Sequence, residues 1–143
     1  MVRAVVATAI AALASSPVAA PTTIEDLATA KKDAKAAGIA WLALVDDLRY
    51  AESWTQASSL FRQKLAQDEW VAMARDVRRG LGKLRERTFE SANYSPTASG
   101  TLVSLVWTST FASMPEVTEQ INMILEDGTW RCLGYFVRPR STK

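Results

Sequence analysis

Apolar side chains recur at steps of three and four residues after Pro21, which is the spacing of one face of an α-helix. The run from Thr22 to Asp26 can form a capping box, so we expect the helix to begin there. Side chains on this face are small at its start and bulky at its end, which suits a helix that lies across a sheet. The positions are Leu27, Ala30, Ala34, Ala37, Trp41, Leu44 and Leu48.

Two further helices are predicted before the apolar period changes. One starts at Ala51 and places Trp54 and Phe61 on the same side. The next is capped by Asp68, whose carboxylate can accept hydrogen bonds from the first free backbone N–H groups. We expect it to end near Gly82, because glycine is a poor helix former. Its apolar positions are Trp70, Met73, Ala74, Val77, Leu81 and Leu84.

In the last third of the chain the apolar period is two, which is typical of strands with one buried face. Residues 101–111 alternate in this way and predict a long strand, and residues 117–125 and 130–137 predict two more. The dipeptide Asp127-Gly128 lies between the last two. It predicts a tight hairpin turn, because both central residues of a type I′ turn need positive φ.

Residues 87–94 predict an additional strand, which the turn-rich run 95–100 separates from the others. Helices followed by consecutive antiparallel strands predict an α+β domain. The N-terminal helices should pack on one face of a curved antiparallel sheet of three to four strands in meander order. We place this single domain at residues 21–138 and expect residues 139–143 to form a loose tail.

The first residues have the layout of a signal peptide. Arg3 supplies a positive charge, residues 4–14 are small and apolar without interruption, and small residues follow. The apolar run is too short to span a bilayer, so no transmembrane anchor should remain after cleavage. Residues 1–20 are therefore predicted to be an export signal that is cleaved after Ala14 or Ala20. The mature protein should be periplasmic or secreted.

Composition excludes several kinds of chemistry. The chain has no His and a single Cys, Cys132, so common zinc sites and Ser-His or Cys-His catalysis are excluded, and no metal or other cofactor is expected. A lone Cys also cannot form an intramolecular disulfide. The formal net charge of +2 does not indicate a partner.

A series of Trp, Gly and Arg positions runs in order between residues 35 and 137. Its first part is Trp41-Leu42-Ala43-Leu44-Val45-Asp46, Tyr50, Ser53-Trp54 and Ala57. It continues with Phe61, Trp70, Arg78, Leu81-Gly82, Arg87 and Phe111, and closes with Asp127-Gly128-Thr129-Trp130-Arg131 and Gly134-Tyr135. This series resembles the pattern of the uncharacterised bacterial family catalogued as domain of unknown function 4019.

The resemblance implies an exported α+β protein, and it supplies no activity. This sequence departs from the family at Leu48-Arg49, where the family usually has a Gly-containing turn. The order of helices before a meander is also similar to the cone-shaped fold of nuclear transport factor two and ketosteroid isomerase. Such cones host enzymes, binding modules and inert scaffolds alike.

Asp46 is the one candidate catalytic residue. A carboxylate inside an apolar cavity can have a raised pKa and move protons. Trp41 and Tyr50 lie close to Asp46 along the chain, so it can be partly buried. The alternative is that Asp46 is solvated, bonds the next helix or pairs with an arginine such as Arg87. One carboxylate without a second convergent group is a weak catalytic signal.

Aromatic residues are candidates for binding a small apolar ligand. Each Trp named here falls on the apolar side of its element, so core packing is the competing interpretation. The candidate ligand-binding residues are Trp41, Tyr50, Trp54, Arg87 and Trp107.

The stretch from Arg75 to Arg87 is rich in arginine and lysine. We do not expect it to bind nucleic acid, because an exported protein rarely meets any and cations suit a helix C-terminus. An anionic envelope surface is a more sensible partner.

Two functions are consistent with these observations. The first is a non-catalytic binding or interaction module of the bacterial envelope, with a small apolar ligand or a protein as its partner. The alternative is an isomerase or dehydratase that uses Asp46 in an aromatic pocket. An open cavity with Asp46 pointing into it would favour the enzyme. A homodimer across the polar sheet face of Ser104, Thr108 and Thr110 is compatible with either function.

Overall fold

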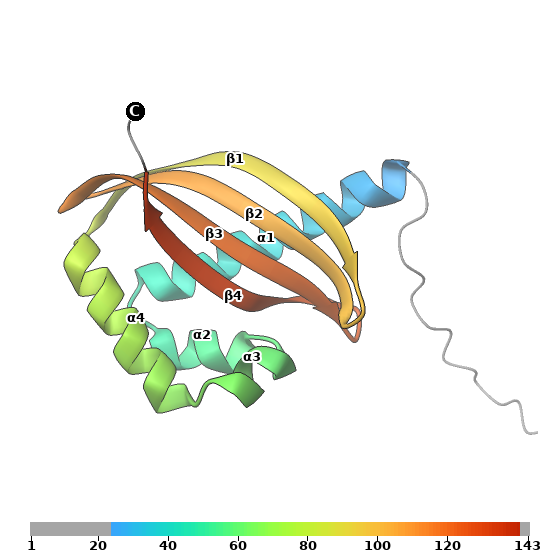
Figure 1. The fold of residues 1–143 in the computed structure, drawn as a ribbon, viewed down its shortest axis with the longest axis horizontal. Coiled ribbons are helices and arrows are strands. Elements are labelled where there is room, and N and C mark those ends of the chain that lie inside the picture. Colours follow the sequence, from blue (N-terminus) through green and yellow to red (C-terminus); the bar gives the residue numbers. More distant parts are fainter. Residues whose placement is uncertain (1–23, 141–143) are drawn as a thin grey trace, which may run out of the picture.

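The computed structural model describes residues 24–140 and shows helices followed by strands (Figure 1). The predicted export signal, residues 1–20, lies outside the described residues, as do residues 141–143. The strands form one antiparallel sheet in the order β1-β2-β3-β4, which confirms the predicted α+β meander. The elements are α1 (Ile24–Asp46), α2 (Tyr50–Gln56), α3 (Ser59–Lys64), α4 (Gln67–Leu81), β1 (Leu84–Thr97), β2 (Gly100–Phe111), β3 (Met114–Glu126) and β4 (Thr129–Pro139).

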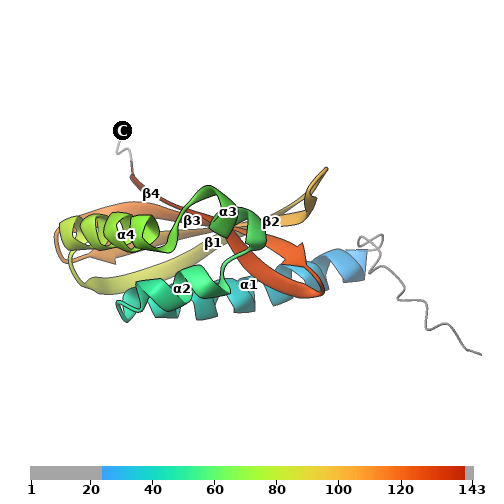
Figure 2. The same ribbon diagram turned by 90° about the horizontal axis from the view of Figure 1, so that it is seen from below.

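Helix α1 lies across one face of the curved sheet and contacts all four strands. Figure 2 shows α1 and α2 together on one side of the strands. Gly38 allows the close approach, because a Cβ atom there would lie 2.6 Å from Cδ1 of Leu105. The alternation in β2 and β3 sends Leu105, Trp107 and Ile121 into the core beneath α1. The predicted strand faces are therefore confirmed.

The opposite positions of the same strands carry polar side chains that hydrogen-bond to one another. Ser104 Oγ donates to Asn122 Oδ1 at 3.0 Å, and Gln120 Nε2 donates to Ser104 Oγ at 3.0 Å. Thr108 Oγ1 donates to Glu90 Oε1 at 2.9 Å. The polar sheet face is present as predicted, and the homodimer across it stays a prediction.

Helices α2, α3 and α4 pack beside α1 and β4, around a cluster of aromatic rings (Figure 1). The ring of Trp70 lies 5.8 Å from that of Trp41 and 5.2 Å from that of Phe61. Ser53 joins them, because its backbone oxygen accepts from Trp41 Nε1 at 2.8 Å and its hydroxyl accepts from Trp70 Nε1 at 2.9 Å. Both indole N–H groups are thus satisfied in the core.

The second predicted helix is divided in two by Ser58. The backbone of Ser58 is extended, and its hydroxyl accepts a hydrogen bond from the N–H of Phe61, which starts α3. Its own N–H donates to the carbonyl of Cys132 at 2.9 Å, which ties this break to β4. The sequence pattern showed the apolar side of this segment but not the cap inside it.

Element ends differ from the predictions at several positions. Helix α1 ends at Asp46, so Leu48 lies in the following turn with φ of 64° and is 69% exposed. Ala66, not Asp68, occupies the N-cap position of α4. Strand β1 continues to Thr97, so the expected loop shrinks to a short turn, and β4 continues to Pro139, which pairs with β3. The predicted hairpin at Asp127 and Gly128 is confirmed, with φ of 50° and 78°.

Within the described residues, none of the helices has the length and apolar character needed to cross a membrane.

Two glycines near the end of α4 should respond to alanine in opposite directions. Gly80 lies inside the helix with nothing within 4 Å of an added Cβ, so Gly80→Ala should raise the free energy of unfolding by about 1 kcal/mol. Gly82 ends the helix with φ of 77°, and an added Cβ would lie 3.1 Å from Ser113 Oγ. Gly82→Ala should therefore lower the free energy of unfolding by about 1–3 kcal/mol. Urea unfolding of both variants checks this, and two shifts of the same sign would contradict it.

Candidate functional site

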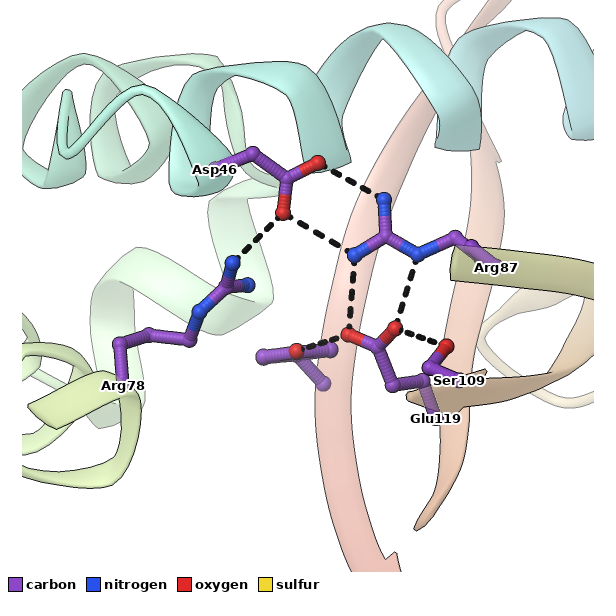
Figure 3. Close-up of polar contacts among 6 residues, drawn as sticks. Asp46, Arg78, Arg87, Ser109 and Glu119 are labelled. Atoms are coloured by element: carbon purple, nitrogen blue, oxygen red, sulfur yellow. Dashed lines mark hydrogen bonds and ion pairs between the residues drawn. The ribbon is translucent and has the colours of Figure 1, made fainter. Parts of the chain in front are cut away.

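A buried polar network lies where the end of α1 meets the sheet. It has six members, and each comes from a different element, so the network joins two helices to all four strands. Most of these side chains point toward one another in Figure 3. The members are Asp46 of α1, Arg78 of α4, Arg87 of β1, Ser109 of β2, Glu119 of β3 and Tyr135 of β4.

Arg87 is the centre of this network. Its Nη1 and Nη2 donate to the two oxygens of Asp46 at 2.7 and 3.0 Å, which is bidentate pairing. On its other side Nε and Nη2 donate to the two oxygens of Glu119 at 2.8 and 3.2 Å. Arg78 Nη2 adds a bond of 2.7 Å to Asp46 Oδ1. One guanidinium thus bridges two carboxylates, and a second guanidinium caps one of them.

Glu119 is fully buried and would be very unfavourable there as an isolated charge. Arg87 compensates its charge, and the hydroxyls of Ser109 and Tyr135 both donate to its oxygens. Each carboxylate oxygen of Glu119 therefore accepts two hydrogen bonds. The two carboxylates and two guanidiniums of the network cancel in formal charge, as expected for ions that are removed from water.

The electrostatics at Asp46 do not favour proton transfer. Burial alone would raise the pKa of this carboxyl, but hydrogen bonds and charge from Arg87, and then from Arg78, outweigh burial and hold the pKa below its ordinary value. Burial, together with the negative charge of Glu119, raises the pKa of Tyr135, so this phenol stays protonated. Asp46 is thus an ionised partner of two arginines.

The lowered pKa of Asp46 predicts a loss of stability in acid. A folded-state pKa below the unfolded one gives stability that is present above the unfolded value, about 3.9, and lost as pH falls through the folded value. Asp46→Asn should thus have a lower free energy of unfolding than the unmodified protein at pH 6. The difference between the two free energies should become smaller below pH ~4. Urea unfolding across this range measures it, with the exposed Asp47→Asn as control. A gap that does not change with pH would contradict the prediction.

An open pocket of about 860 Å³ lies beside the network. Its wall combines the end of α1 and the turn after it with the last turns of α4 and the start of β1. Asp46 and Arg78 belong both to the network and to this wall. The lining residues are Asp46, Asp47, Leu48, Tyr50, Arg75, Arg78, Arg79, Gly82, Lys83 and Leu84.

The structure brings some of the predicted site residues together and separates others. Asp46 and Arg87 are bonded to each other, and Tyr50 lines the pocket near Asp46. Trp41 and Trp107 are each 3% exposed and belong to the core. Trp54 donates its indole N–H to the carbonyl of Leu65 at 2.7 Å, away from this pocket.

Glu119 and Arg78 were not among the predicted site residues, although both left a signal. Glu119 occupies an inward position of β3 between Val117 and Ile121, where the alternation calls for an apolar residue. Arg78 lies on the buried side of α4, one turn after Ala74. A charged residue at a core position of either pattern indicates a buried partner of opposite charge.

These features define a class: an α+β domain in which helices pack on a four-stranded antiparallel meander and a buried ion-pair network joins the two. Within that class, the family model described as "Protein of unknown function (DUF4019)" matches residues 37–135, which is more than half of the chain. The chain belongs to this family, as the resemblance predicted. The match includes all six network residues. A search of the curated proteins finds no match to this chain.

Among the described residues there is no group of three or more His, Cys, Asp or Glu side chains placed to hold a metal ion. Cys132 is buried, and burial raises the pKa of its thiol, so it is not an activated nucleophile.

Proposed function

We propose that this protein is an exported, non-catalytic binding module, and that its ligand occupies the open pocket beside Asp46. The observation that carries the proposal is the state of Asp46, which lies in the pocket wall with Arg78 and Arg87 bonded to its oxygens. A general base needs a free lone pair and a pKa near the working pH. Three hydrogen bonds from Arg78 and Arg87 engage the Asp46 carboxylate and its pKa lies below its ordinary value, so Asp46 is a poor base even though it lines an open pocket. The pocket is therefore better suited to holding a molecule than to changing it.

Export is supported by the sequence alone, through the charge of Arg3 and the apolar run of residues 4–14. To test it, residues 1–23 are fused to an alkaline phosphatase that is active only outside the cytoplasm. The fusion should be active, and Ile10→Lys within the apolar run should abolish this activity. Mass spectrometry of the released protein should give a chain that begins at Ser15 or Pro21. An inactive fusion would contradict export.

Binding is tested on protein made with its own N-terminus and purified gently from the periplasm. Native mass spectrometry should show a species heavier than the bare chain, and mild activation should release the extra mass. A bare chain in every preparation would contradict the proposal. Leu48→Ala removes an exposed apolar side chain from the pocket wall and should reduce the bound fraction, whereas Ile39→Ala, at an exposed apolar position of α1 outside the pocket, is the control.

A further inference from the structure

The wall of this pocket carries an excess of positive charge. Four lining residues are cations and two are carboxylates. Asp46 and Arg78 belong to the balanced network, so they contribute no net charge when taken with Arg87 and Glu119. The charges that remain on the wall are those of Arg75, Arg79 and Lys83 against the single carboxylate of Asp47.

These cations are available for a ligand. Within residues 24–140, neither Arg75 nor Lys83 forms an ion pair. Arg79 lies 3.9 Å from Asp76, and both side chains are largely exposed, so this pair is weak. Three cations converge on one hollow with little internal compensation.

Arg78 gives a second, independent indication. Its side chain is only 7% exposed, and its Nη1 is buried with no hydrogen-bond partner in the described part of the chain. An unsatisfied buried donor is unfavourable, and more so when the group is charged. Arg78 lines the pocket and packs 4.9 Å from the centre of the Phe111 ring. Its Nη1 is buried, so a ligand oxygen in the pocket bonds to this donor only if the side chain shifts toward the pocket.

The same pocket also has apolar lining. Leu48 is exposed, and its φ of 64° lies in the left-handed region that a leucine rarely adopts. Tyr50 and Leu84 complete this part of the wall. Backbone strain of this kind is concentrated at functional sites. A molecule bound in the pocket would cover the exposed side chain of Leu48.

We propose that the pocket binds a small organic anion in which an acid group, carboxylate or phosphate, is joined to an apolar body. The acid group lies among Arg75, Arg79 and Lys83, where guanidinium forks can bind two oxygens at once. The apolar body lies on Leu48, Tyr50 and Leu84. This inference rests on the proposed function and adds the chemical class of the ligand. The pocket is within the usual size range for such ligands.

The test uses isothermal titration calorimetry at low salt with three probes: decanoate, decanol and inorganic phosphate. Decanoate should bind best, because its carboxylate can contact the cationic side chains and its alkyl chain can contact the apolar side chains of the wall. Decanol and phosphate should each bind about tenfold more weakly or not measurably. Binding of the protein to vesicles with and without phosphatidylglycerol then distinguishes an anionic lipid headgroup from a free organic anion as the ligand.

A pair of matched double variants assigns the binding to the pocket. Arg75→Gln with Lys83→Gln removes two charges from the wall, and Arg62→Gln with Lys64→Gln removes the same charge from α3, outside the pocket. The first pair should weaken decanoate binding about tenfold or more, and the second by less than about threefold. All four side chains are exposed, and circular dichroism verifies that both variants fold.

The outcomes separate the two proposals. Decanol binding as tightly as decanoate, or equal losses in the two double variants, would overturn the anion inference and leave the binding module standing. Failure of every probe, together with a bare chain in native mass spectrometry, would overturn both.

Discussion

Arg87→Met should lower the free energy of unfolding by about 3–5 kcal/mol, because it leaves Glu119 buried without a compensating charge. Asp46 would keep only Arg78 as a cationic partner. Methionine is chosen because it keeps much of the volume of the arginine stem and adds no polar group. The expected fall in Tm is roughly 10–20 °C, measured by thermal and urea unfolding followed by circular dichroism.

Two further variants make this result specific to the network. Arg85→Met removes an exposed arginine from the same strand and should change stability by less than about 0.5 kcal/mol. Adding Glu119→Gln to Arg87→Met removes the unpaired buried charge, so part of the lost stability should return. If Arg87→Met were as mild as Arg85→Met, the network would not hold the helices to the sheet.

Trp41→Ala should produce a loss of similar size, about 3–5 kcal/mol, for a different reason. Trp41 is 3% exposed and lies against Trp70 and Tyr135, so its removal leaves a cavity between α1, α4 and β4. The carbonyl of Ser53 also loses its indole donor. Chemical unfolding at pH 7 measures the change.

Trp41→Phe separates the two contributions, because phenylalanine keeps a ring in the core but lacks the N–H group. It should lower stability by about 1–3 kcal/mol, less than alanine does. Ile39→Ala on the same helix is the control, since Ile39 is half exposed, and it should lower stability by less than about 1 kcal/mol. Equal losses for Trp41→Ala and Ile39→Ala would show that the aromatic cluster adds little.

The fold was predictable because its main signals are local. The face of α1 from Leu27 to Leu44, and the alternation of β2 and β3, follow directly from which side chains must leave water. The turn at Asp127 and Gly128 follows from the backbone freedom of these residues. Each of these patterns lies within a single helix, strand or turn.

The element ends and the site depend on contacts that such patterns do not contain. The break at Ser58 needs the carbonyl of Cys132, which lies far along the sequence. The bond of Arg87 to Asp46 joins positions 41 apart, and its bond to Glu119 joins positions 32 apart. The sequence paired Asp46 with Arg87. The alternation of β3 marks Glu119 as a buried charge, but only the register of the sheet shows that its partner is the same arginine.

The six-residue network also affects the rate at which the protein unfolds. Its bonds join segments far apart in the sequence, so they can form only after both helices and the strands have met. Interactions that form this late are largely absent from the transition state for folding, and they act mainly by slowing unfolding. This would lengthen the lifetime of the folded chain in the presence of proteases, which matters most in the exported state that we propose.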